Sequence, residues 1–267
     1  MSRPAAPAGP DEDAFHDYWH AAGLGAVAPV EAAARGGAAA LSLPQVFIAG
    51  YQAALRAVFP DLPADGWAAL AAAEDRKEPE RFPGTVLTAA GGGHRLDGFK
   101  SWIGQSRHVR HLMVTAKLDG AVRIVRLPHD RAGVTISHRD APGFLRGLSQ
   151  GFGRFEGVAV SPDELMSGEA GREFARAERL FVMLACAAFL QARSGGGTDA
   201  PATGLAGYLE AGEHDPARLA ELDRQLQRAA ASFAGTPAAD AVPDWDADRG
   251  LIAMYSRKIQ ERDPAKA

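Results

Sequence analysis

The stretch from Gly91 to Trp102, GGGHRLDGFKSW, decides the fold that we predict for this chain of 267 residues. His94–Leu96 alternates polar and apolar side chains, as a half-buried β-strand does. Asp97-Gly98 is a dipeptide typical of hairpin turns, and Lys100–Gly104 resumes the strand pattern. The stretch therefore predicts two short strands joined by a tight turn at Asp97-Gly98.

Further strand patterns lie on both sides of this stretch, with glycine turns such as Asp119-Gly120 between them. They cover Thr85–Ala89, Leu112–Ala116, Val122–Leu127, Gly133–Ser137 and Arg154–Val160. About six strands in roughly 90 residues predict a small antiparallel β-barrel or sandwich. The run Trp67–Ala73 is apolar throughout, and periodicity alone leaves it open as helix or strand.

Helical patterns precede and follow the predicted sheet. The clearest is Gly171–Arg193, where apolar residues recur at spacings of three and four. The expected helices cover 14–22 with Asp13 as N-cap, Pro29–Ala40, Gln45–Val58, Gly171–Arg193, Pro216–Phe233 and Asp246–Gln260. Ser194–Thr203 is rich in glycine and small polar residues, as flexible linkers are.

This order predicts an α+β fold in three segments. We expect a disordered tail over residues 1–13, which is rich in proline, alanine and acid. An N-terminal helical segment over 14–66, a middle β domain over 67–166 and a C-terminal helical segment over 167–267 follow it.

Composition limits the class of protein. The chain is 46% hydrophobic and 23% charged, as soluble globular proteins are, and its net charge of −4 speaks against nucleic-acid or anionic-membrane binding. A single cysteine, Cys186, excludes a disulfide within the chain, and its apolar surroundings predict a buried thiol. Without a membrane-spanning run or a signal-peptide pattern, we expect a cytoplasmic protein.

Three motifs resemble the acyl-CoA dehydrogenase family. Gly98–Gly104 is similar to the family's middle-domain signature, in which Gly, Lys and Trp-Ile-Thr stand at this spacing. Phe155–Leu165 is similar to its Phe-x-x-Val-x-Val-Pro-x-x-x-Leu, with Ser161 inserted, and Glu178–Leu180 to its first C-terminal helix. The resemblance implies N-terminal helices, a middle antiparallel β-barrel or sandwich and a C-terminal helical bundle, with FAD as cofactor and acyl-CoA or another acyl thioester as substrate.

Other family elements are missing. Ala73–Asp75 stands where the family has Thr-Glu-Pro followed by Gly-Ser-Asp, and Gly104 stands where it has the Thr that contacts the flavin. The Arg-x-x-Phe-Gly element that reaches the FAD pyrophosphate and a Gln-x-x-Gly-Gly element near the C-terminus are absent. A pyrophosphate needs cations or backbone N–H groups aimed at it. The chain thus resembles a shortened, divergent member with weakened FAD binding, unless a partner chain supplies the adenylate half.

The resemblance implies a catalytic base at Glu178 and cofactor contacts from Trp102, Ile103 and Gly104. Trp102 fits either the wall of a flavin pocket or the core of the sheet. At helical spacing Glu178 has only apolar neighbours, which would desolvate its carboxylate and raise its pKa toward that of a general base. The alternative is a glutamate at the boundary of the helix face that reaches solvent or pairs with a distant arginine.

A set of basic residues could hold phosphates or could be solvated strand and turn residues. The set is Arg107, His108, Arg110, His111, Arg123, Arg126, His129 and Arg131. The histidines show no spacing typical of a metal site, and no Gly-x-Ser-x-Gly indicates a serine hydrolase.

Two functions remain open. One is an FAD-dependent acyl-CoA dehydrogenase-like oxidoreductase that oxidises an acyl thioester at its α and β carbons. The other is a non-catalytic or half-site subunit, with weak or no FAD binding, that completes a heteromer with a full-length paralogue. In both cases we expect a homo-oligomer or heteromer, because the apolar residues Leu219, Leu222 and Leu226 would otherwise stay partly exposed.

Overall fold

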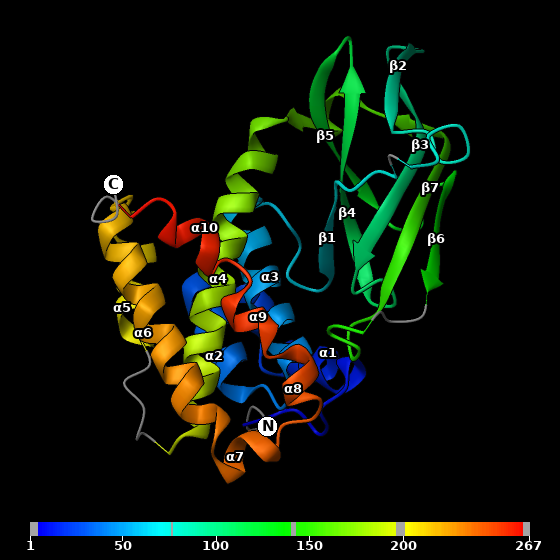
Figure 1. Ribbon diagram of the computed structural model, residues 1–267. Coiled ribbons are helices and arrows are strands. Elements are labelled where there is room, and N and C mark those ends of the chain that lie inside the picture. Colours follow the sequence, from blue (N-terminus) through cyan, green and yellow to red (C-terminus); the bar gives the residue numbers. More distant parts are fainter. Residues whose placement is uncertain (1–4, 76, 140–142, 196–200, 264–267) are drawn as a thin grey trace. The chain divides into compact units, whose positions relative to one another are not determined.

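The computed structural model describes residues 5–75, 77–139, 143–195 and 201–263 (Figure 1). The chain forms two compact units, each described by itself below. The β unit comprises residues 58–141 and 148–175, and the helical unit comprises residues 1–57, 142–147 and 176–267.

The β unit is one eight-stranded sheet. Its strands are β1 (Trp67–Ala71), β2 (Val86–Ala90), β3 (Gly93–Gly104), β4 (Val109–Leu118), β5 (Ala121–Pro128), β6 (Val134–Arg139), β7 (Gln150–Val160) and β8 (Leu165–Ser167). The order is β6-β7-β3-β2-β4-β5-β8, with β1 beside β4. Among the described strands, the β1–β4 and β2–β4 pairs are parallel and the others antiparallel. The predicted α+β class is confirmed, although the described strands form an open sheet with β6 and β8 at its ends rather than a closed barrel.

The predicted turn at Asp97-Gly98 is wrong, because β3 runs through it without reversing. The chain reverses earlier, at Gly91-Gly92, where both φ angles are positive (55° and 83°) and Ala90 pairs with Gly93. Gly98, at φ 130°, shifts the register between β3 and β7 instead. A Cβ atom there would lie 2.6 Å from the carbonyl oxygen of Gly84, so only glycine fits this bulge.

The apolar alternation that predicted the strands forms the core of the β unit. Leu96, Ile103, Val114, Phe155 and Val158 are almost completely buried in one cluster. The ambiguous apolar run is a strand: β1 is buried along its whole length and runs parallel to β4. A strand that is buried on both faces shows no alternation, which is why its pattern was ambiguous.

The helical unit contains helices α1 to α3, most of α4, and α5 to α10. The division between the two units falls within α4. The α-helices are α1 (Glu12–Ala21), α2 (Pro29–Ala39), α3 (Leu43–Val58), α4 (Glu169–Arg193), α5 (Ala202–Glu210), α6 (Pro216–Ala234), α7 (Pro237–Asp240), α8 (Trp245–Asp248), α9 (Gly250–Ala253) and α10 (Ser256–Gln260). Two short 3₁₀ helices, η1 (Leu24–Ala26) and η2 (Pro162–Glu164), complete the assignment.

The first and the last predicted helix both differ from prediction, and α5 was not predicted. Asp11, not Asp13, caps α1 by accepting the Ala14 N–H at 2.8 Å. The helix therefore begins inside the predicted tail, whose first four residues lie outside the described part of the chain. The predicted helix over Asp246–Gln260 is broken into α8, α9 and α10.

Close helix contacts and buried leucines hold the helical unit together. A Cβ atom on Gly37 would lie 2.3 Å from the carbonyl oxygen of Ala185, so α2 and α4 meet backbone to backbone. Leu222 and Leu226 of α6 are buried within this unit, at 6% and 0% exposure. Leu219 is half-buried, so most of the leucine face from which we predicted an oligomer is covered within the unit, and the oligomeric state stays a prediction.

Candidate functional site

Trp102 lies near the end of β3, where its indole ring covers Gly104. A Cβ atom on Gly104 would lie 2.8 Å from the ring carbon Cη2 of Trp102. The ring is half-exposed, whereas the side chain between them, Ile103, is fully buried in the core of the sheet. A side chain at position 104 would thus require the ring to shift, and Ile103 can offer a cofactor only its backbone.

A buried amide fixes the indole from the neighbouring strand. Gln150 Oε1 accepts the Trp102 indole N–H at 3.1 Å and the Arg139 Nη2–H at 2.9 Å. Gln150 itself is 6% exposed, whereas Arg139 is exposed and its guanidinium also lies 5.9 Å from the ring centroid of Phe152. Indole, amide and guanidinium therefore form one ordered row at the ends of β3, β7 and β6.

Glu178 lies on α4, the first long helix after the sheet, with its side chain half-buried among apolar neighbours. Burial raises the pKa of its carboxyl from 4.5 to about 7, and a hydrogen bond from Tyr255 opposes this rise. A carboxyl that titrates near neutral pH can both accept and release a proton, as a general base must. The predicted desolvation of Glu178 is therefore present within the helical unit.

Tyr255 reaches Glu178 from the broken C-terminal helix, and a ladder of hydrogen bonds to α6 holds that segment. Ser256 Oγ and Gln260 Nε2 both donate to the buried Asp223 Oδ2 at 2.7 Å. Gln227 donates to the carbonyl oxygen of Ile252 at 3.0 Å. Burial, followed by the Glu178 charge, raises the pKa of Tyr255, so its hydroxyl stays protonated and able to donate.

Lys100, the lysine of the motif, does not line an open site. Its ammonium group donates to Glu74 Oε1 at 2.7 Å and to Thr115 Oγ1 at 2.9 Å, and its side chain is 1% exposed. Glu74 also accepts the Thr85 N–H at 3.3 Å. The pair ties the loop after β1 to β3, so the lysine has a structural role within the β unit.

The predicted site residues fall into two groups. Trp102, Ile103 and Gly104 belong to the β unit and Glu178 to the helical unit, and the geometry of each is given within its own unit. Sequence reasoning missed Gln150 and Tyr255. Both act through contacts between segments that are far apart along the chain, and neither stands in a motif that could have shown them.

The predicted basic set does not form one cluster. Arg110 Nη1 and His129 Nε2 lie 3.4 Å apart, but Arg131 is paired with Glu164 and the ring of His108 meets the edge of Trp67. No group of three or more potential metal ligands occurs within the described ranges. Likewise, none of the described helices is long and apolar enough to cross a bilayer.

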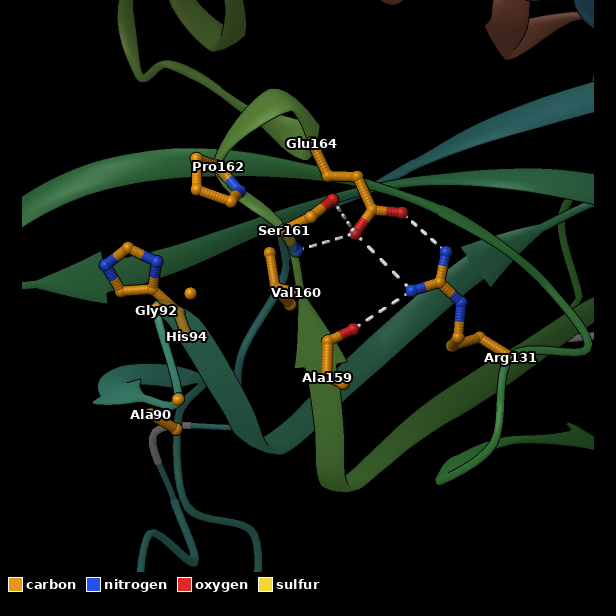
Figure 2. A pocket seen from close by; sticks show the side chains of 11 residues that line it. Ala90, Gly92, His94, Arg131, Ala159, Val160, Ser161, Pro162 and Glu164 are labelled. Atoms are coloured by element: carbon orange, nitrogen blue, oxygen red, sulfur yellow. Dashed lines mark hydrogen bonds and ion pairs between the residues drawn. The ribbon is translucent and has the colours of Figure 1, made fainter.

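An open pocket of about 360 Å³ lies beside the Gly91-Gly92 turn (Figure 2). Its charged groups bind one another: Arg131 Nη2 donates to Glu164 Oε1 at 2.5 Å, and Glu164 Oε2 accepts the Ser161 N–H at 2.9 Å. These bonds stabilise the turn after β7, where Ser161 and Glu164 form a capping box. These charged groups are thereby paired, and their side chains have a structural role in the turn.

The residues around Trp102 fit the ring half of a flavin. The half-exposed indole offers an apolar surface for stacking, and the Arg139 guanidinium beside it offers N–H groups to a phosphate or a ring oxygen. Gly104, however, has no hydroxyl group to replace the threonine that the resemblance implies. The ring contacts would come from the indole and from backbone groups of β3.

Comparisons with known proteins establish the fold. No protein-family model and no curated protein sequence matches the chain. Among solved structures, it is similar to an FAD-dependent dehydrogenase (12% identity, 95% of this chain and 92% of that chain, TM-score 0.69). It is also similar to the prolyl acyl carrier protein oxidase AnaB (13% identity, 95% of this chain and 89% of that chain, TM-score 0.67). A third similar structure is glutaryl-CoA dehydrogenase from Mycobacterium smegmatis (17% identity, 90% of this chain and 76% of that chain, TM-score 0.55). The chain therefore has the acyl-CoA dehydrogenase-like fold that the residues from Gly98 to Leu165 predicted.

Proposed function

We propose that this protein is a flavin-dependent oxidoreductase that oxidises an acyl thioester at its α and β carbons, with Glu178 as the base. The observation that carries the proposal is the half-buried carboxyl of Glu178, whose pKa burial raises to about 7. The acyl-CoA dehydrogenase-like fold and the ordered indole of Trp102 support it. In a structural role, a carboxylate would ordinarily be exposed or paired with a cation.

The chemistry asked of Glu178 is removal of a proton from the carbon next to the thioester carbonyl. Its carboxylate takes that proton, while the Tyr255 hydroxyl holds the carboxylate in place and stabilises its charged form. The apolar residues beside Glu178 on α4 keep water away and so preserve its basicity.

FAD is the cofactor that this proposal requires, and the chemistry it would supply is acceptance of the hydride from the β carbon. Trp102, with its indole fixed by Gln150, would hold the ring system, and the backbone at Gly104 would contact the ring edge. Two of the similar proteins are named for a carrier-protein thioester and a CoA thioester. We therefore propose an acyl thioester as the substrate class and leave the carrier to the test.

The test is turnover of the purified protein supplied with FAD, a series of acyl-CoA and acyl-carrier-protein thioesters, and a dye as electron acceptor. Glu178→Gln should lower kcat roughly 10²–10⁴-fold, the usual effect of losing a positioned base. Glu173→Gln, which alters an exposed glutamate on the same helix, is the matched control and should leave kcat unchanged. Bound FAD without oxidation of any thioester would refute the proposal.

One observation favours the alternative of a half-site subunit, which completes a heteromer with a full-length paralogue. Gly104 lacks the hydroxyl group that the resemblance implies beside the flavin, and a larger residue there would require the indole that covers it to shift. Under this alternative the isolated chain would bind FAD weakly or not at all and would turn over no thioester, and full activity would require a second, different chain.

A further inference from the structure

We propose that a strip of aromatic rings and arginines on the β unit binds an adenosine diphosphate moiety, the half of FAD for which the sequence offers no known element. The proposal rests on the proposed function in so far as FAD is the cofactor. The strip consists of Phe82, Phe99 and Phe152, with Arg81 at one end and Arg139 at the other.

The rings of the strip follow one another in contact. The centroids of Phe82 and Phe99 lie 4.6 Å apart, and those of Phe99 and Phe152 lie 5.8 Å apart, with both pairs of planes inclined by 31°. Phe99 is 7% exposed, whereas Phe82 and Phe152 are half-exposed. Half-exposed rings in a row offer surfaces on which a purine can stack, an interaction that stabilises bound bases in many proteins.

Cations accompany the rings. The Arg81 guanidinium carbon lies 4.9 Å from the centroid of Phe82, and that of Arg139 lies 5.9 Å from the centroid of Phe152. Arg154 is exposed and pairs directly with Phe99 across β3 and β7, so the two side chains share a face of the sheet. Arg81 and Arg154 also pair with carboxylates, of Glu78 at 3.2 Å and of Glu156 at 3.9 Å. Arg139 lies against Phe152 and keeps N–H groups for a phosphate.

The charge of Arg139 is not neutralised by a carboxylate in any ion pair of the described residues. Its nearest hydrogen-bond partner is the neutral amide of Gln150, which also holds the indole of Trp102. The strip is therefore continuous with the proposed flavin-ring site. A dinucleotide laid from Trp102 toward Phe82 would meet, in order, a ring surface, a cation for its pyrophosphate and aromatic surfaces for its adenine.

FAD and CoA both contain an adenosine diphosphate moiety, and the experiment must separate them. ADP alone is titrated into the purified protein by calorimetry. We then measure the affinities of riboflavin, FMN and FAD from the quenching of flavin fluorescence, and that of CoA by calorimetry with and without ADP. We expect ADP to bind, FAD to bind at least about tenfold more tightly than FMN, and ADP to displace FAD. Displacement of CoA instead would assign the strip to the CoA substrate.

Substitutions locate the site. Arg139→Gln should weaken ADP and FAD binding roughly 10- to 100-fold, as loss of a charge-assisted hydrogen bond does. Phe152→Leu keeps an apolar side chain and should weaken ADP binding roughly 5- to 100-fold through lost stacking, with little effect on riboflavin. Arg172→Gln, which alters an exposed arginine of the β unit at the start of α4 and outside the strip, is the control and should bind like the wild type.

Two results would overturn the proposal: no ADP binding by the wild type, or strip variants that bind ADP and FAD as the wild type does. Neither depends on turnover. If the strip binds FAD but no thioester is oxidised, the proposed function fails and the strip stands. If thioesters are oxidised while the strip variants keep full FAD affinity, the strip proposal fails and the proposed function stands.

Discussion

Lys100 Nζ lies 2.7 Å from Glu74 Oε1, and the two side chains differ sharply in exposure, at 1% for the lysine and 30% for the glutamate. The pair joins the lysine of the family-like motif to the loop after β1. Because the cation is buried and the anion reaches water, the partners are not equivalent. Removing the carboxylate leaves the buried ammonium group of Lys100 without its counter-charge, whereas removing the ammonium leaves a carboxylate that water can solvate.

We therefore predict that Glu74→Gln lowers the free energy of unfolding by about 3–5 kcal/mol and that Lys100→Met lowers it less. Urea denaturation at pH 7 measures both. Burial alone would raise the pKa of Glu74, but Lys100 and the Thr85 N–H bring it below its ordinary value of 4.5. The pair's contribution is thus complete above pH 4.5 and lost as the pH falls below it. A larger loss in Lys100→Met than in Glu74→Gln would contradict this account.

A second prediction concerns the contact between α2 and α4. Gly37→Ala would place a methyl group 2.3 Å from the carbonyl oxygen of Ala185, and backbone cannot move aside as a flexible side chain can. We expect a loss of about 1–3 kcal/mol or more in the free energy of unfolding. Gly207→Ala, in α5 with open space around it, is the matched control and should gain about 0.5–1 kcal/mol. Equal effects of the two substitutions would show that the helices separate easily.

Local patterns predicted most of the fold. The alternation along Arg154–Val160 buries one face of β7, so the sequence carries this periodicity directly. The spacing along Gly171–Arg193 predicted α4, although residues 181–190 are buried on every side. Asp97-Gly98 misled because a turn dipeptide indicates a glycine with unusual φ but not whether the strand reverses there. The two glycines at Gly91-Gly92, both at positive φ, supply the reversal, and Gly98 is needed for a bulge instead.

The candidate site was less predictable, because its geometry depends on contacts between distant segments. Trp102 and Glu178 stand in motifs, but the hydrogen bond from Trp102 to Gln150 spans 48 residues along the chain. The broken helix after Asp244 was missed for a related reason. Asp223 on α6 binds Ser256 and Gln260, so tertiary hydrogen bonds fix the path of that segment.

A third prediction uses the pKa of Glu178 as a property of the fold. In the unfolded chain the carboxyl ionises near pH 4.5, whereas burial delays its ionisation in the folded protein to about pH 7. The folded state therefore loses stability as the pH rises from 4.5 to 7, and the loss stays constant above that. Glu178→Gln should abolish this loss and be more stable than the wild type at pH 8 by roughly 1–3 kcal/mol. Urea midpoints from pH 5 to 8.5 provide the measurement, and parallel pH curves for the two proteins would count against a buried carboxyl.

The last prediction concerns Tyr255, whose hydroxyl donates to Glu178 and lowers its pKa against the effect of burial. Tyr255→Phe removes that donor, so the pKa of Glu178 should rise above about 7. Since the base must be ionised to act, the acid limb of the kcat/KM profile should move to higher pH, with turnover reduced at pH 6.5 and close to wild type at pH 9. The groups whose charges act on the Tyr255 hydroxyl are Glu178, Cys186 and Tyr51. Burial raises the pKa of Cys186 to about 12, so this thiol stays neutral across the profile.

Tyr208→Phe is the matched control, because its hydroxyl donates to the carbonyl oxygen of Asp215 rather than to Glu178. It should leave the acid limb where it is. The stability curve gives a second readout that needs no turnover: in Tyr255→Phe, the pH interval over which stability is lost should extend above pH 7, because the folded carboxyl ionises later. If neither the acid limb nor the stability curve moves in Tyr255→Phe, or both move equally in Tyr208→Phe, then Tyr255 does not position the base.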